Sequence, residues 1–188
     1  RVLFRSQPYE LIRGIAIKVL RALCYLNEHQ LIHCDLSCSN ILFRRDGQLA
    51  LIDFGLSCFE GSDLCMEVQT LSYRSPEVLL EIPYTGKIDM WSFGCLLGFL
   101  YKGRPIFKGK DEHDHLLAIM EVLGIPEVEI IDKSPLRYMY FDKDYKPRSI
   151  DKKGYKERVP GSKPLETVLE GAEESFLDFV KKCLIYDP

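Results

Sequence analysis

The chain has 188 residues, of which 46% are hydrophobic and 28% charged, the composition of an ordinary globular protein with one sizeable core. Its net charge of -3 argues against a nucleic-acid or membrane surface, and no apolar run reaches the roughly 18–20 residues that span a bilayer. Seven irregularly spaced cysteines without a Cys-x-x-Cys pair argue against a disulfide framework or a structural zinc site, and predict an intracellular protein.

The first predicted helix runs from Pro8 to about Asn27, because proline is tolerated in a first helical turn and apolar residues recur every three or four positions. The residues expected to face the core are Leu11, Ile12, Ile15, Val19, Leu23 and Leu26.

A β-hairpin is predicted next, with strands at 41–43 and 48–52. Asp46-Gly47 between the two apolar runs is a strong turn signal. Such a hairpin would carry Asn40 and Asp53 at its two outer ends, on the same side.

Residues 58–70 lack periodicity and are predicted to form a loop, and Pro76 marks the start of a further helix. The segment 89–101 is apolar nearly all round, which predicts a helix buried in a large core. Residues 111–123 form a helix that begins with acidic residues, as the helix dipole favours. The last predicted helix, 173–186, is expected to bury Phe176, Phe179, Val180, Cys183 and Leu184.

The composition changes between residues 132 and 163. Ten Lys or Arg residues against five Asp or Glu residues give this segment a charge of +5, so the remainder carries -8. Four tyrosines and three prolines are scattered through it. We interpret the segment as a basic surface insertion rather than a separate domain.

Candidate functional residues concentrate between Ile32 and Gly55. This stretch brings Asp35, Asn40 and Asp53 together between strongly apolar flanks. Oxygen-bearing side chains on rigid supports suit a hard divalent cation and a phosphate. The order His-x-Asp-Leu-x-x-x-Asn followed by Asp-Phe-Gly is typical of the catalytic and metal-binding loops of protein kinases.

The chain resembles the helical, C-terminal lobe of a eukaryotic protein kinase, and more narrowly the dual-specificity tyrosine-regulated kinase (DYRK) family of the CMGC group. The motifs that carry this narrower resemblance are Cys34, Ser57-Cys58 after Asp-Phe-Gly, residues 73–78 and 88–92, Asp111-Glu112, residues 123–126 and residues 159–163. The resemblance implies a mainly α fold, a helical bundle with a short hairpin that carries the catalytic and metal-binding loops. It also implies that residues 1–188 are part of a kinase domain. The N-lobe, with its glycine-rich loop and strand lysine, is then expected in the parent chain, and this fragment alone is expected to be inactive.

The resemblance implies transfer of the ATP γ-phosphate to Ser or Thr hydroxyls of protein substrates, with Tyr left open and Mg²⁺ as the metal. Asp35 would be the general base, Asn40 and Asp53 would hold magnesium, and Leu42 would form the floor under the adenine. The Thr70 hydroxyl would hydrogen-bond Asp35. The structural alternatives are a buried aspartate, a helix-capping asparagine, a core leucine and a loop threonine.

Three further positions acquire roles from the same resemblance. Arg74 would shape the pocket just after the target residue and favour proline-directed sites, although a surface arginine is the alternative. Glu77 matches a glutamate that pairs with an arginine beyond Pro188. Asp89 would hold the catalytic loop through backbone N–H groups.

Two departures from the family pattern matter for activity. Ser37 replaces a lysine that steadies the transferring phosphate, and loss of such a donor costs roughly 10²–10³ in rate. Glu67 replaces a self-phosphorylated tyrosine, and Leu71 replaces one of the two arginines that hold its phosphate. The hypothesis is that Glu67 faces the remaining Arg74, so that the loop is active without phosphorylation; a solvated glutamate is the alternative.

Two other functions compete with the kinase. A pseudokinase or scaffold is supported by Ser37 and opposed by the retained Asp35, Asn40 and Asp53. A small-molecule phosphotransferase shares the His-x-Asp motif, but residues 75–77 and 89–92 disfavour it.

Overall fold

A computed structural model describes residues 7–44, 46–62, 65 and 67–187. Its helices and strands, in chain order, are α1 (Tyr9–Glu28), β1 (Leu31–Ile32), β2 (Ile41–Phe43), β3 (Leu49–Leu51), β4 (Cys58–Phe59), α2 (Pro76–Leu79), α3 (Lys87–Lys102), α4 (Glu112–Leu123), α5 (Val128–Lys133), α6 (Arg137–Tyr140), α7 (Leu165–Val168) and α8 (Glu174–Cys183). Two 3₁₀ turns, η2 (Cys38–Asn40) and η3 (Leu71–Tyr73), lie between them. Most of the regular structure is therefore helical, as the predicted mainly α fold requires.

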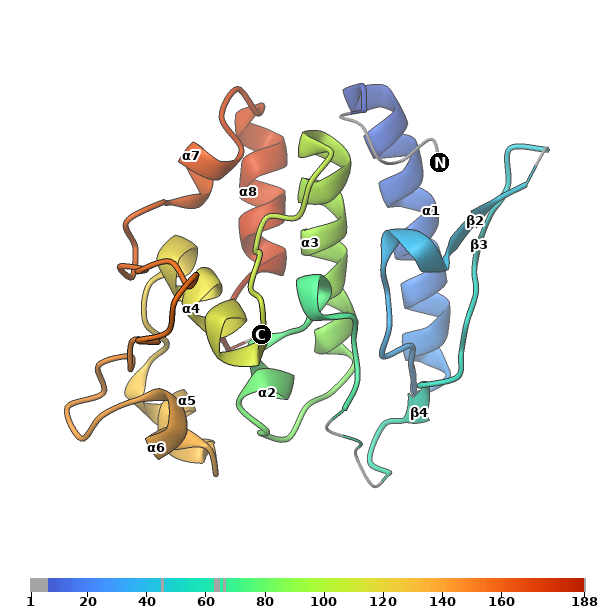
Figure 1. Cartoon of the computed structure of the whole chain (residues 1–188). Coiled ribbons are helices and arrows are strands. Elements are labelled where there is room, and N and C mark those ends of the chain that lie inside the picture. Colours follow the sequence, from blue (N-terminus) through green and yellow to red (C-terminus); the bar gives the residue numbers. More distant parts are fainter. Residues whose placement is uncertain (1–6, 45, 63–64, 66, 188) are drawn as a thin grey trace.

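Helix α3 is the centre of the molecule and lies between α1 and α8 (Figure 1). Most of its residues are buried, because the helix is apolar nearly all round. Its partners approach closely at two glycines: a Cβ at Gly94 would lie 2.8 Å from Cys183 Cβ, and one at Gly98 would lie 2.1 Å from Ile106 Cδ1. None of the described helices is both long enough and apolar enough to cross a membrane.

The predicted inward faces of α1 and α8 are mostly confirmed. The core residues of α1 are Ile12, Ile15, Val19, Leu23 and Leu26, but Leu11 is 41% exposed, so its predicted burial is wrong. In α8, Val180 and Cys183 are buried, whereas Phe179 is 38% exposed. Successive residues of a helix point about 100° apart. Leu11 and Phe179 each lie one position before a buried residue, at the edge of the apolar stripe.

The predicted hairpin is present as β2 and β3, paired antiparallel with Leu42 opposite Ala50. The Ile52 N–H donates to the Asn40 carbonyl at 3.0 Å just beyond the last pair, which brings Asp53 beside Asn40.

A second ladder, β1 with β4, pairs Leu31 with Phe59 and Ile32 with Cys58. The prediction of a loop throughout 58–70 is thus wrong at its first two residues. A two-residue strand is too short to show any periodicity.

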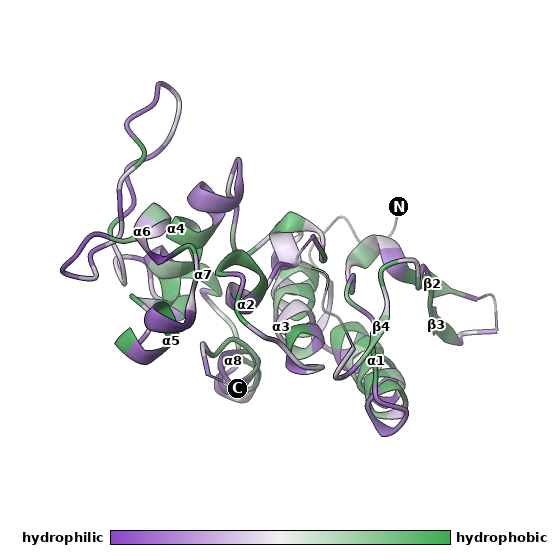
Figure 2. Ribbon diagram, turned by 90° about the horizontal axis from the view of Figure 1, so that it is seen from below, coloured by the Kyte–Doolittle hydropathy of each residue, from purple (hydrophilic) through white to green (hydrophobic). Residues whose placement is uncertain are grey.

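The basic segment is fastened to α4 by Arg158. This guanidinium donates to Asp114 at 2.7 Å, to Glu121 at 2.9 Å and to the Lys108 carbonyl at 2.7 Å. The pairs with the two carboxylates are buried on both sides. The loop that extends beyond α6 is mostly hydrophilic (Figure 2). Arg158 is therefore an ordered anchor between the predicted surface insertion and the helical core, and Tyr155 and Lys156 add contacts with Asp111 and Glu121.

Candidate active site

The N-terminal end of α3 holds the loop that carries Asp35. The Asp89 carboxylate accepts the His33 N–H at 2.7 Å and the Cys34 N–H at 3.0 Å. Burial raises the pKa of Asp89 to about 6, against the opposing effect of the two N–H groups. Cys34 has a φ of 63°, which non-glycine residues rarely adopt, and the two hydrogen bonds stabilise that conformation. The predicted contact between Asp89 and the catalytic loop is confirmed.

The Asp35 carboxylate is held from both sides. Its Oδ1 accepts the Thr70 N–H at 2.8 Å and the Thr70 hydroxyl at 2.7 Å. Its Oδ2 accepts Asn40 Nδ2 at 2.8 Å, and the same Nδ2 donates to the Asp35 carbonyl at 2.8 Å. The hydrogen bond predicted between Thr70 and Asp35 is present. Because Nδ2 makes both contacts, the amide oxygen of Asn40 is the atom available to a cation.

His33 ties the catalytic loop to the end of the hairpin. Its Nδ1 accepts the Asp35 N–H at 3.2 Å, so Nε2 carries the ring proton and donates it to the Ile52 carbonyl at 3.2 Å. The ring also packs 4.8 Å from the Phe54 ring. Burial lowers the pKa of His33, which keeps the imidazole neutral near pH 7. Sequence reasoning assigned no role to this residue, although the His-x-Asp motif was the signal for it.

Asp53 follows Ile52, whose N–H donates to the Asn40 carbonyl, and its carboxylate is open to solvent. It has a φ of 64°, it is exposed, and its Oδ1 lies 3.4 Å from the Gly55 nitrogen. An exposed carboxylate and a neighbouring amide oxygen are the hard ligands that Mg²⁺ prefers, so the donor set fits that ion. Leu42, predicted to lie under an adenine, is half exposed on β2.

Ser37 does not occupy the role of the lysine it replaces. The side chain is 1% exposed, and its hydroxyl lies 2.7 Å from the Ser39 hydroxyl. Among the described residues, the side-chain partners of Asp35 are Thr70 and Asn40. Position 37 therefore provides no positively charged side chain beside Asp35.

The predicted pairing of Glu67 with Arg74 is wrong. Arg74 Nη1 donates to Glu112 Oε1 at 2.5 Å, while Nε and Nη2 donate to the Gln69 carbonyl at 3.1 and 2.8 Å. Glu67 is exposed and forms no ion pair within the described part of the chain. Its carboxylate is not needed at Arg74, because Glu112 from α4 already supplies one. Sequence reasoning missed both partners of Arg74. Gln69 is separated from Arg74 by the turn η3, and Glu112 lies 38 residues further along the chain.

Glu77 is buried, and its Oε2 has no hydrogen-bond partner among the described residues. Burial raises the pKa of this carboxyl group. A buried carboxylate oxygen without a partner is unfavourable. The pairing of Glu77 with an arginine beyond Pro188, which the resemblance implies, stays a prediction.

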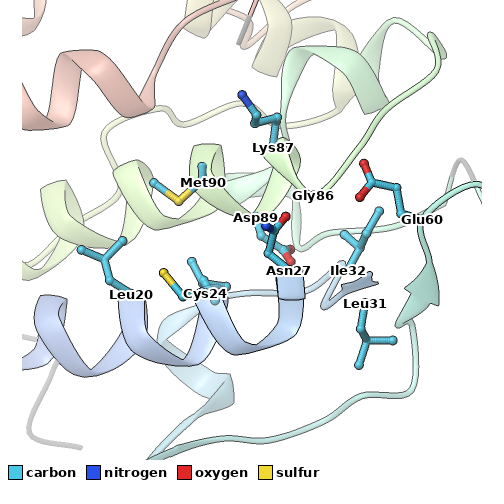
Figure 3. Close-up of a pocket in the computed structure, with 11 residues that line it drawn as sticks. Leu20, Cys24, Asn27, Leu31, Ile32, Glu60, Gly86, Lys87, Asp89 and Met90 are labelled. Carbon is cyan, nitrogen blue, oxygen red and sulfur yellow. The ribbon is translucent and has the colours of Figure 1, made fainter. Parts of the chain in front are cut away.

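A cavity of about 260 Å³ lies between α1, β1 and the start of α3 (Figure 3). Leu20 and Cys24 of α1 and Met90 of α3 line it, together with Asp89 and Ile32. Asp35, Asn40 and Asp53 are not among its lining residues, so the candidate chemistry lies outside this cavity.

Comparison with known proteins agrees with this geometry. Residues 5–188 match the family described as Protein kinase domain. Human dual specificity tyrosine-phosphorylation-regulated kinase 4 is 41% identical over 187 residues, which cover 98% of this chain and 36% of that protein. The DYRK-family kinase pom1 of Schizosaccharomyces pombe is 42% identical over 188 residues, covering 98% of this chain and 17% of the relative. Serine/threonine-protein kinase ppk5 of the same yeast is 38% identical over 187 residues, with 98% and 22% covered. The chain thus spans between 17% and 36% of the lengths of these three relatives.

Proposed function

The chain belongs to the protein kinase domain family, with homologues among the DYRK kinases, and from that premise we propose that the complete protein transfers the γ-phosphate of ATP to Ser or Thr hydroxyls of protein substrates. The observation that carries the proposal is the cluster of Asp35, Asn40 and Asp53 at the junction of the catalytic loop and the hairpin. The proposal includes an N-terminal lobe in the complete protein, which supplies the rest of the nucleotide site.

Asp35 orients the substrate hydroxyl and accepts its proton. Three donors fix the carboxylate, two from Thr70 and one from Asn40, so it does not need to reorganise when the hydroxyl arrives. Asn40 and Asp53 would hold magnesium, which when bound neutralises charge on the nucleotide phosphates. Asp89 and His33 hold the backbone of the catalytic loop, and so the position of Asp35, through their hydrogen bonds.

The segment around Gln69 and Arg74 favours target sites in which a proline follows the residue that carries the hydroxyl. The Gln69 carbonyl receives two donors from Arg74 and is therefore not free to accept an N–H from a bound peptide. Proline has no N–H and loses nothing by this arrangement, whereas other residues leave a donor unpaired.

The test is Mg²⁺-dependent nucleotide binding and phosphate transfer to a Ser-Pro peptide by the complete protein. We expect Asp35→Asn to lower transfer by about 10²–10⁴-fold with nucleotide binding retained, and Asp53→Asn to weaken Mg²⁺-dependent binding. Asp46→Asn is the matched control on the same hairpin, since the partners of Asp46 within the described residues are Arg44 and the Gln48 N–H. Nucleotide binding without transfer by the unmutated protein would overturn the proposal.

That last outcome defines the second candidate, a pseudokinase or scaffold. Ser37 favours it, because the buried hydroxyl is bonded to Ser39 and brings no positive charge toward Asp35. In this case the ordered site serves to bind a nucleotide or a protein partner.

A further inference from the structure

Gln69 is the fixed point of the segment that follows the catalytic loop. It has a φ of 64° and is 2% exposed, and its N–H donates to the Cys34 carbonyl at 2.8 Å. Its side-chain amide donates to the Ile88 carbonyl at 3.0 Å and to the Ser92 hydroxyl at 2.8 Å, both on α3. The amide oxygen accepts the Ser75 N–H at 2.9 Å. Gln69 is therefore held by the core, and its carbonyl has one defined direction.

Arg74 is the group that meets this carbonyl, and its own orientation depends on a carboxylate from another element. The side chain is 17% exposed, with two of its nitrogens on Gln69 and the third on Glu112. Among the ion pairs of the described residues, Glu112 is the partner of Arg74.

Glu112 is itself well placed for this contact. It is the first residue of α4, where a negative charge is favoured by the helix dipole. The preceding residue, Asp111, caps the helix by accepting the Asp114 N–H at 2.9 Å, and it also accepts the Tyr155 hydroxyl at 2.6 Å. The start of α4 is thus ordered independently of Arg74.

We propose that Glu112 is a positioning residue for substrate selection: it holds Arg74 on the Gln69 carbonyl, so that the peptide-binding segment is set without a phosphorylated loop residue. The role of Glu112 in substrate selection rests on the proposed kinase function, whereas its role in positioning Arg74 does not. Glu112 performs the task first assigned to Glu67, from a helix 38 residues further along than Arg74.

The geometric part is tested by NMR of the Arg74 Nε–H signal in this chain, assigned by its disappearance in Arg74→Lys. We expect Glu112→Gln to increase exchange of that proton with water by about two- to fivefold, the range expected when an exposed ion pair is lost. In Glu112→Asp, the exchange rate of this proton should lie between those of Glu112→Gln and the unmutated protein. Glu166→Gln is the matched control, because Glu166 forms a surface pair with Lys181 at comparable exposure far along the chain. An unchanged signal in Glu112→Gln, or a larger effect from Glu67→Gln, would overturn the proposal.

The substrate part is tested in the complete protein by the ratio of kcat/KM for peptides with Pro or Ala after the target serine. We expect Glu112→Gln to lower this ratio by about two- to fivefold and Glu112→Asp to restore part of it. An unchanged ratio despite a changed Arg74 signal would refute the selection role. If no variant transfers phosphate, the proposed function fails, and the NMR result alone still decides whether Glu112 positions Arg74.

Discussion

Position 37 carries the prediction about the rate of phosphate transfer. Asp35 has all its expected contacts, but Ser37 turns to Ser39 and leaves the catalytic loop without a cation. A fixed positive group near a transferring phosphate stabilises the transition state without reorganisation, and a hydroxyl cannot replace its charge.

We therefore expect Ser37→Lys to raise the turnover of the complete protein by about 10²-fold. Ser62→Lys is the matched control: it adds the same charge at an exposed loop serine whose hydroxyl donates to the Phe59 carbonyl. Steady-state phosphate transfer is the measurement. Equal turnover in Ser37→Lys and the unmutated protein would place the weakness outside the catalytic loop.

Helix α4 contains a buried histidine, His115, which makes the stability of the fold depend on pH. His115 is fully buried, and neither ring nitrogen has a hydrogen-bond partner among the described residues. Burial, and then the charges of Arg74 and Arg158, lower its pKa to about 3, with Asp114 acting in the opposite direction. The ring meets Phe107 edge-on, with centroids 6.3 Å apart. The folded chain thus holds this histidine neutral.

Acid should destabilise the fold through this residue. The unfolded chain takes up the proton near pH 6.5, whereas the folded chain does so only near pH 3, so stability is lost as pH falls between these values. The loss should reach about 2 kcal/mol by pH 5. In urea unfolding at pH 7.5 and 5.0, His115→Leu should reduce the loss of stability by about 2 kcal/mol, the share of this residue, because the raised pKa of Asp89 and the lowered pKa of His33 act in both proteins. The variant should be neutral or stabilising at pH 7.5. His29→Leu, at an exposed histidine, should keep the loss; a His115→Leu protein that keeps it too would contradict the explanation.

At the scale of the whole molecule, close packing around α3 holds the helices together. Gly94 has no room for a methyl group because Cys183 of α8 lies against it. At Gly14 of α1, apart from its chain neighbours and the backbone of its own helix, no described atom lies within 4 Å of the position that a Cβ would take. The same substitution should therefore have opposite effects at the two sites.

We expect Gly94→Ala to lower the free energy of unfolding by about 1–3 kcal/mol, since overpacking forces the helices apart. Gly14→Ala should raise it by about 0.5–1 kcal/mol, because alanine stabilises a helix interior that it can enter without strain. Each variant controls for the other in equilibrium urea unfolding. A similar sign at both positions would show that the α3–α8 contact is looser than described.

Local patterns in the sequence determined most of the helices and the hairpin. The periodicity of α1, the all-round apolarity of α3 and the Asp-Gly turn each reflect interactions within a few residues, which local reasoning can read. The contacts of Asp35 with Thr70 and of Asp89 with the catalytic loop were also predicted, because the resemblance to protein kinases implies them.

Only the tertiary structure decided which partner each charged side chain takes. Nothing near Arg74 in the sequence favours Glu112 over Glu67, and nothing near Ser37 indicates that its hydroxyl turns to Ser39. The short β1–β4 ladder and the exposure of Leu11 have the same origin. These outcomes depend on how helices distant in the chain pack together, and an ion pair forms with whichever carboxylate that packing brings within reach.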